Sequence, residues 1–155
     1  MKTIDDWLKL YGRDHQNPTN KLIHWFCVPI IMFSVLGLLW CIPLRVAGYN
    51  WLNAATILYV FALIFYFRLS IPLFSGFLLI GGGMLYLSAV LYAALGASTY
   101  LYILIGVFVG AWILQFIGHK IEGQKPSFFE DMQFLLIGPA WLMHFVFKKI
   151  GIKYN

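Results

Sequence analysis

Four histidines are the residues in this 155-residue sequence whose chemistry is most informative: His15, His24, His119 and His144. Neutral imidazole is the commonest metal ligand in proteins, and a neighbouring carboxylate or amide often fixes the tautomer that binds the ion. A histidine taken alone has a plainer interpretation, in which its ring only meets water or lipid headgroups. Polar residues spaced around these histidines favour a shared metal site instead.

The first polar cluster surrounds the start of a predicted helix. Asn17 and Pro18 are typical of a helix start, with asparagine at the N-cap and proline at the first helical position. Asn20 and His24 are four residues apart, so they share one face of that helix. His15 lies just before the helix, where a loop can fold its ring back toward the same face.

The second polar cluster ends a later helix. Gln115 and His119 are four residues apart and Glu122 follows three residues later, so all three side chains share a face. Gly123 is a natural helix C-cap, and Pro126 lies just beyond it. The amide and the two carboxyl oxygens of this cluster, like the Asn20 amide, are candidates to orient metal ligands or substrate.

The helices that carry these clusters are predicted to cross a membrane. Hydrophobic residues make up 61% of the chain and charged residues 11%, against about 25% charged in soluble domains. We predict an all-α integral membrane protein, a single domain over residues 1–155, because the apolar runs lack the alternation of barrel strands. Its four transmembrane helices are expected at about 18–43, 51–68, 72–96 and 99–122.

A fifth apolar stretch, at about 132–148, is too short for a comfortable crossing. Gly138 and Pro139 in its middle should break or kink a helix. We therefore predict a short re-entrant or interfacial helix. Four crossings place nearly all Lys and Arg residues on one side and leave only Arg45 on the other, so both termini are expected in the cytoplasm. All four histidines then lie near the cytoplasmic face, and His144 could join the other three.

Other features exclude several functional classes. The basic residues form no stripe suited to nucleic acid, and they are expected to meet anionic membrane lipids instead. No GxSxG, Walker or GxGxxG motif is present. The polar first twenty residues are unlike a signal peptide. Cys27 and Cys41 form no CxxC pair, and the run Gly81-Gly82-Gly83 is expected to allow close helix packing.

At these residues the sequence resembles the membrane-bound 2-hydroxy fatty acid dioxygenases of fatty acid α-oxidation, a family first described in yeast. The resemblance covers nearly the whole chain. One departure is that Cys27 stands where the family commonly has a glycine, three residues after the second histidine. The matching residues are Tyr11, His15, Asn20, His24 and Pro29, then Gln115, Gly118, His119, Glu122, Gly123 and Pro126, and finally Gly138-Pro139.

The resemblance implies an enzyme that uses Fe(II) and O₂ to cleave long-chain 2-hydroxy fatty acids to CO₂ and an acid one carbon shorter. It assigns the iron to His15, His24 and His119, and the topology adds His144 as a further candidate ligand. Tyr11, Asn20, Gln115 and Glu122 would be the other catalytic residues. Because the substrate can supply all four electrons, no second cofactor is needed.

Two other functions stay open at this point. In a haem-binding membrane protein, His24 and His119 would be axial ligands. A lipid-binding or scaffold protein would hold no metal and would tolerate His-to-Ala changes. We expect a bacterial inner membrane, with the endoplasmic reticulum as the alternative for a eukaryotic source.

Overall fold

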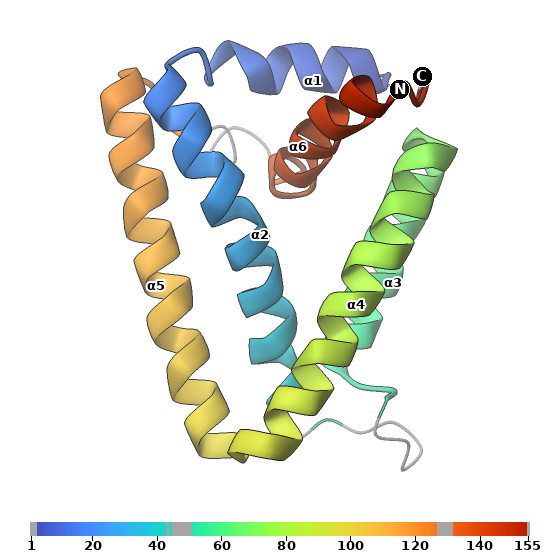
Figure 1. Ribbon diagram of the computed structural model, residues 1–155, viewed down its shortest axis with the longest axis vertical. Coiled ribbons are helices and arrows are strands. Elements are labelled where there is room, and N and C mark those ends of the chain that lie inside the picture. The colour runs from blue at the N-terminus through green and yellow to red at the C-terminus, as the bar shows by residue number, and fades with distance from the viewer. Residues whose placement is uncertain (1–2, 43, 45–50, 127–131, 155) are drawn as a thin grey trace.

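Six helices make up the part of the chain that the computed structural model describes, residues 3–42, 44, 51–126 and 132–154. Figure 1 shows α2 beside α5 and α3 beside α4, two pairs that diverge from the α4–α5 corner to form a V. Helices α1 and α6 lie across the open end of the V, where both ends of the chain also lie. The helices are α1 (Ile4–Arg13), α2 (Pro18–Trp40), α3 (Ala54–Leu69), α4 (Ile71–Leu95), α5 (Ala97–Glu122) and α6 (Phe134–Ile150).

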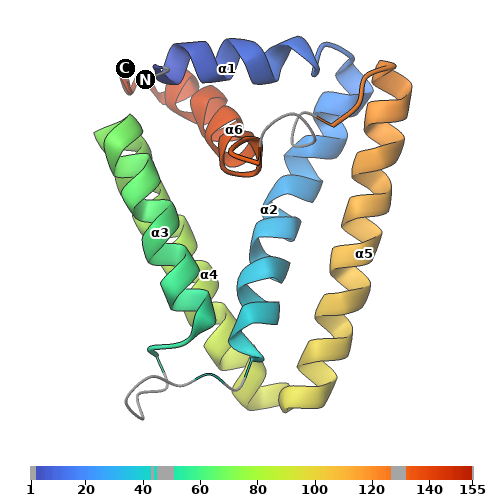
Figure 2. The same ribbon diagram turned by 180° about the vertical axis from the view of Figure 1, so that it is seen from behind.

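Three of these helices, α2, α4 and α5, are long and apolar enough to cross a membrane. The prediction of an all-α membrane protein is therefore confirmed. Helix α3 is the shortest of the four helices that were predicted to cross the membrane. Its 16 residues give about 24 Å of helix, against a hydrocarbon core of about 30 Å. Seen from behind in Figure 2, α3 still runs alongside α4 and returns the chain to the open end of the V.

The helix boundaries differ from the predicted ones for local reasons. Helix α2 ends at Trp40, and the predicted opposite-side cation, Arg45, lies outside the described residues. Helix α3 begins only at Ala54, because the Asn53 side chain accepts hydrogen bonds from the first backbone N–H groups of the helix. Gly96 makes the corner between α4 and α5 with a φ of 77°, a conformation that glycine adopts without strain.

The sequence predicted that Gly138 and Pro139 break or kink the C-terminal helix, and α6 shows no break. It passes through Gly138 and Pro139 without interruption. Both residues are buried, and packing on the neighbouring helices stabilises a helix that proline alone would weaken. A Cβ at position 138 would come within 2.9 Å of the Tyr11 hydroxyl, so glycine is what allows α1 to approach here. The position of α6 across the open end of the V agrees with the interfacial alternative.

Helix α1 was not predicted, although its signals are present in the sequence. The Thr3 hydroxyl and the Asp6 carboxylate form a capping box at its start. Its buried residues recur at helical spacing and pack against α6, with the rings of Trp7 and Phe134 edge to face at 5.3 Å. These buried residues are Ile4, Trp7, Leu8 and Tyr11.

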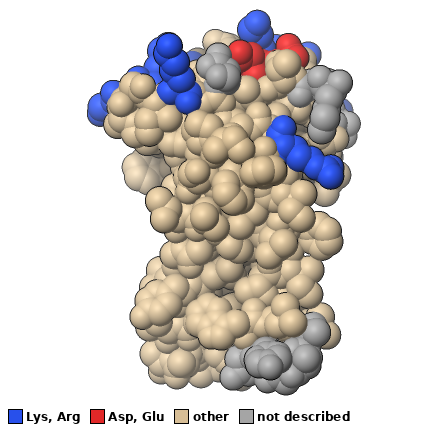
Figure 3. Space-filling model, turned by 90° about the vertical axis from the view of Figure 1, so that its right-hand side faces the viewer, with Lys and Arg blue, Asp and Glu red and all other residues tan. Residues whose placement is uncertain are grey.

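Charged side chains gather at the open end of the V. On the face shown in Figure 3, every blue or red group lies in the upper part of the molecule, and the described residues of the lower part carry none. In the described ranges, no Lys, Arg, Asp or Glu lies between Trp25 and Arg68 or between Ser70 and Ile117. The long helices therefore present an uncharged surface to the membrane, and the open end carries the polar groups.

Candidate metal centre

Three of the four histidines meet beneath α1, at the open end of the V. His15 comes from the turn between α1 and α2, His24 from the second turn of α2 and His119 from the last turn of α5. Their side chains are 0%, 1% and 4% exposed. This meeting is as the sequence predicted. The Asn17 side chain caps α2 by accepting from the Thr19 N–H, and the cap turns the preceding loop, with His15, back over the helix.

Backbone carbonyls fix the tautomers of two of these rings. The Nδ1–H of His15 donates to the carbonyl of Tyr11 at 2.7 Å, and the Nδ1–H of His24 donates to the carbonyl of Asn20 at 2.9 Å. A carbonyl can only accept, so in the neutral rings both Nε2 atoms carry a lone pair. These two Nε2 atoms face each other at 3.0 Å. Two lone pairs at that distance repel, and a cation beside them removes the conflict.

His119 completes the cluster. One ring nitrogen from each histidine lies within 4.8 Å of the other two, and no other group of three or more candidate ligands occurs in the described residues. The Nδ1 of His119 is buried and has no hydrogen-bond partner in that part of the chain. The three rings stand nearly perpendicular to one another, with centroids 4.3 to 5.0 Å apart. Converging lone pairs and an unpartnered buried nitrogen fit a metal ion.

The surroundings keep His15 in the form that binds metal. Burial lowers the pKa of His15, although its bond to the Tyr11 carbonyl and the nearby Asp14 raise it in part. The Tyr11 ring stacks on the His15 ring with centroids 4.1 Å apart. Burial raises the pKa of Tyr11 far above its usual value, so Tyr11 is a neutral phenol at physiological pH. Tyr11 therefore orients His15 through both its carbonyl and its ring.

Glu122 lies beside the cluster but does not point into it. Its carboxylate accepts from the backbone N–H of Gln16 at 2.7 Å and of Asn17 at 2.9 Å, and from the Asn20 side-chain amide at 3.1 Å. All three donors lie at or just before the start of α2, where a negative charge is favourable. Glu122 thus ties the end of α5 to the turn that carries His15.

Asn20 and Gln115 occupy different places around the histidines. Asn20 is wedged between α2 and α5, where a Cβ at Gly118 would overlap its Oδ1. Gln115 lies one turn before His119 on α5 and lines an internal cavity. Asn20 is therefore a packing and orienting residue, whereas Gln115 can meet a ligand in that cavity.

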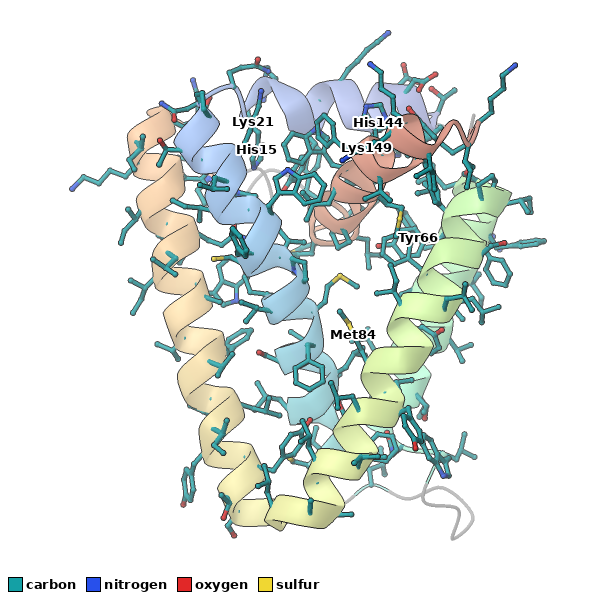
Figure 4. The ribbon with its side chains drawn as sticks, in the orientation of Figure 1. His15, Lys21, Tyr66, Met84, His144 and Lys149 are labelled. Carbon is teal, nitrogen blue, oxygen red and sulfur yellow. The ribbon has the colours of Figure 1, made fainter. Side chains whose placement is uncertain are left out.

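The fourth candidate, His144, is not brought to the cluster. Its Nδ1 is hydrogen-bonded to the Tyr154 hydroxyl. Figure 4 shows His144 on α6, apart from His15. Burial lowers the pKa of His144, and the positive charge of Lys148 lowers it further. The group of candidate ligands that the structure brings together contains His15, His24 and His119 and leaves out His144, the further ligand that the topology had suggested as possible.

An apolar cavity of about 440 Å³ leads away from the histidines into the V. Its polar end contains Tyr11, His24, Gln115 and His119, and the rest of its wall comes from apolar residues of α2, α3, α4, α5 and α6. Volumes of about 300 to 1,000 Å³ with a few convergent polar groups are typical of small-molecule sites. The sequence did not predict this cavity, since the residues that line it look like ordinary membrane-helix side chains.

Sequence reasoning also missed two neighbours of His15. The Trp141 ring on α6 lies 5.4 Å from the His15 ring, and the buried Asp14 carboxylate is paired with Arg13 at 2.9 Å. Asp14 had a usable signal, since it directly precedes a candidate ligand. Trp141 had none, because only the packing of α6 under α1 brings it there.

Comparison with known proteins agrees with the motifs. The family model described as 2-hydroxy-palmitic acid dioxygenase Mpo1-like matches residues 1–150. The chain is 35% identical over 144 residues to the 2-hydroxy-palmitic acid dioxygenase MPO1 of Saccharomyces cerevisiae, covering 91% of this chain and 78% of the yeast protein. No solved structure matches. The chain belongs to the Mpo1-like family of 2-hydroxy-palmitic acid dioxygenases.

Proposed function

We propose that this protein is an Fe(II)-dependent dioxygenase that shortens long-chain 2-hydroxy fatty acids by one carbon. His15, His24 and His119 would hold the iron, and the cavity beside them would hold the acyl chain. One observation carries the proposal: His24 and His119 line the polar end of an otherwise apolar cavity, and His15 forms a three-histidine cluster with them. A carboxylate head and a long hydrocarbon tail are the parts of a substrate that such a cavity fits.

The overall reaction balances with O₂ as the only co-substrate. R–CH(OH)–COOH and O₂ give R–COOH, CO₂ and H₂O. The bond between C1 and C2 breaks, C2 is oxidised to a carboxylic acid, C1 leaves as CO₂, and O₂ takes up the four electrons released. Iron bound by imidazoles with open positions would supply the redox chemistry that lets O₂ react with this closed-shell substrate.

The chain's own residues would bind, orient and exclude water. Gln115 can hydrogen-bond the polar head of a substrate, since it lines the cavity one turn from His119. Tyr11 holds His15 in its binding tautomer. Glu122 and Asn20 act as positioning residues, because their hydrogen bonds end on the α2 start rather than in the cavity. The apolar walls keep bulk water away from the reacting carbons.

The haem alternative is less well supported by the geometry. Axial histidines would need a slot for the macrocycle between them, but the His24 and His119 rings are edge to face at 4.9 Å. We also propose that the histidine end faces the cytoplasm, because the described Lys and Arg residues gather there. The host membrane, bacterial or endoplasmic reticulum, stays a prediction.

The test is metal content and visible spectrum of the detergent-purified protein, for the wild type and for His119→Ala. Near-stoichiometric iron without a Soret band, lost in the variant, together with O₂ uptake that depends on a 2-hydroxy acid, is the expected result. A Soret band would support the haem alternative. No metal after anaerobic Fe(II) reconstitution would overturn the proposal and leave a lipid-binding or scaffold protein.

A further inference from the structure

The cavity is elongated and runs down the V from the histidines. Its lining residues follow in matching order along antiparallel helices, from His24 to Leu36 on α2 and from His119 to Phe108 on α5. Twelve residues separate His24 from Leu36, which corresponds to about 18 Å along the helix. Carbon–carbon bonds of about 1.5 Å each advance an extended chain by less than their own length, so about 18 Å holds at least about 12 carbons.

Tyr59 of α3 lines the cavity at the level of Leu36, away from the histidines, and packs against the cluster that contains Leu36. Its hydroxyl donates to the carbonyl of Leu78 at 2.7 Å and lies 3.2 Å from the carbonyl of Phe77, both on α4. The ring lies on Gly81, where any Cβ would overlap it, and the hydroxyl is 3.5 Å from the Cβ position of Gly82. Two of the three consecutive glycines therefore form the seat of this one ring.

Solid packing lies below the Tyr59 ring. A buried apolar cluster of Leu36, Trp40, Ala55 and Leu85 occupies the narrow end of the V, and Tyr59 and Met84 pack against it. Figure 4 shows Met84 in the lower part of the space between α2 and α4. The ring thus separates an open cavity above it from a filled core below it.

We propose that Tyr59, held on the Gly81 seat, sets the longest acyl chain that the protein accepts. This inference rests on the proposed function and deepens it. A chain that enters carboxylate first toward the histidines would meet the Tyr59 ring with its terminal methyl. Apolar pockets discriminate by about 10- to 200-fold for each methylene that does not fit. One ring at the end of the cavity is therefore sufficient to define a length limit.

The first test is Tyr59→Leu, measured against 2-hydroxy acids that increase in length by two carbons. Removal of the phenol ring lengthens the cavity, so the longest accepted chain should increase by two to four carbons. The kcat/KM ratio of that longer acid to the best wild-type substrate should increase at least about tenfold. The matched control is Tyr86→Leu, which removes the same ring from a lipid-facing position of α4 that is 65% exposed. Its length profile should not change.

Gly81→Ala tests the same seat in the opposite direction. The added Cβ overlaps the Tyr59 ring, and the packed cluster below prevents the ring from moving down. The ring must move up into the cavity, so the preferred chain should become shorter. Opposite shifts from two substitutions in contact would not result from a general loss of stability.

Binding to the metal-free protein separates this inference from the proposed function. Native mass spectrometry with unsubstituted saturated fatty acids of graded length requires neither iron nor turnover. The wild type should show a length limit that increases in Tyr59→Leu and decreases in Gly81→Ala. The same limit in all three proteins would overturn the role of Tyr59, even if the wild type oxidises 2-hydroxy acids. A length limit that shifts in a protein without oxidation activity would support Tyr59 and overturn the proposed reaction.

Discussion

At the scale of single residues, the three clustered histidines are held in three different ways. His15 is fixed by the carbonyl and the stacked ring of Tyr11, and His24 by a carbonyl of its own helix. His119 has no such partner at Nδ1 among the described residues and is held by its packing against the His15 and His24 rings. Glu122 accepts its hydrogen bonds from Gln16, Asn17 and Asn20 rather than from the rings, and it joins the elements that carry them.

We predict that Glu122→Ala lowers metal affinity by about 10- to 100-fold without unfolding the protein. The carboxylate accepts hydrogen bonds from the N–H groups of Gln16 and Asn17 before α2. Its loss lets the turn that carries His15 move. Chelator competition with Fe(II) or Co(II) measures the affinity. Glu122→Gln keeps one acceptor oxygen, so its metal affinity should lie between those of the wild type and Glu122→Ala. A loss as complete as in His24→Ala would contradict a positioning role and make Glu122 a ligand.

A second residue-scale prediction concerns Gly118 of α5, which lies against the Asn20 side chain of α2. A Cβ there would overlap the Asn20 amide oxygen, so Gly118→Ala should destabilise the protein by about 1–3 kcal/mol. Thermal unfolding in detergent measures the loss. Gly110→Ala is the matched control on the same helix, since nothing lies within 4 Å of its Cβ position. Equal melting temperatures of the two variants would refute the close contact.

At the scale of elements, α1 and α6 form a cover over the open end of the V. They contact each other, and both contribute rings around His15, namely Tyr11 from α1 and Trp141 from α6. The Tyr66 hydroxyl of α3 donates to the carbonyl of Leu136 on α6, and this hydrogen bond connects the cover to the α3–α4 pair. The surroundings of His15 in the candidate metal centre therefore depend on α1 and α6 as well as on the long helices α2 and α5.

We predict that Trp7→Ala loosens α1 and thereby reduces iron occupancy, although Trp7 is not itself a proposed ligand. Truncation of a buried tryptophan costs about 3–5 kcal/mol, and here it removes the contact with Phe134. Hydrogen exchange should increase across α1 while α4 and α5 stay protected. Lys9→Ala, on the exposed face of α1, serves as the control and should behave like the wild type. Full iron occupancy in Trp7→Ala would show that the cover is dispensable.

At the scale of the whole molecule, charge and shape agree on which end leaves the membrane. The described charged residues lie at the end that carries α1, α6 and the histidines, and the narrow end of the V is uncharged in the described ranges. A substrate from the bilayer can keep its tail in the apolar V while its head reaches the polar end. This arrangement explains why a fatty acid enzyme is built from membrane helices.

The orientation is testable by cysteine labelling in a Cys27→Ala, Cys41→Ala background. In vesicles with the cytoplasmic face outward, a membrane-impermeant maleimide should label Lys9→Cys and leave Thr99→Cys unlabelled. Detergent should expose both positions equally, which is the internal control. The reverse labelling pattern would place the histidine end outside the cytoplasm.

The sequence alone determined the features that depend on short-range spacing and on composition. Hydropathy located α2, α4, α5 and the C-terminal helix to within a few residues, and helical spacing placed Asn20 with His24 and Gln115 with His119. The three-histidine meeting followed from topology, because an even number of crossings brings both clusters to one end. The family followed from the same motifs.

Only the tertiary structure decided the features that depend on how helices cross. The angle between the α2–α5 pair and the α3–α4 pair makes the cavity. The packing of α3 on α4 places the Tyr59 ring on Gly81, although both residues look like ordinary membrane-helix residues in the sequence. The packing of α6 under α1 kept the helix continuous through Pro139 and turned His144 away from the cluster. Local propensity cannot predict such outcomes, because burial between elements distant in sequence outweighs it.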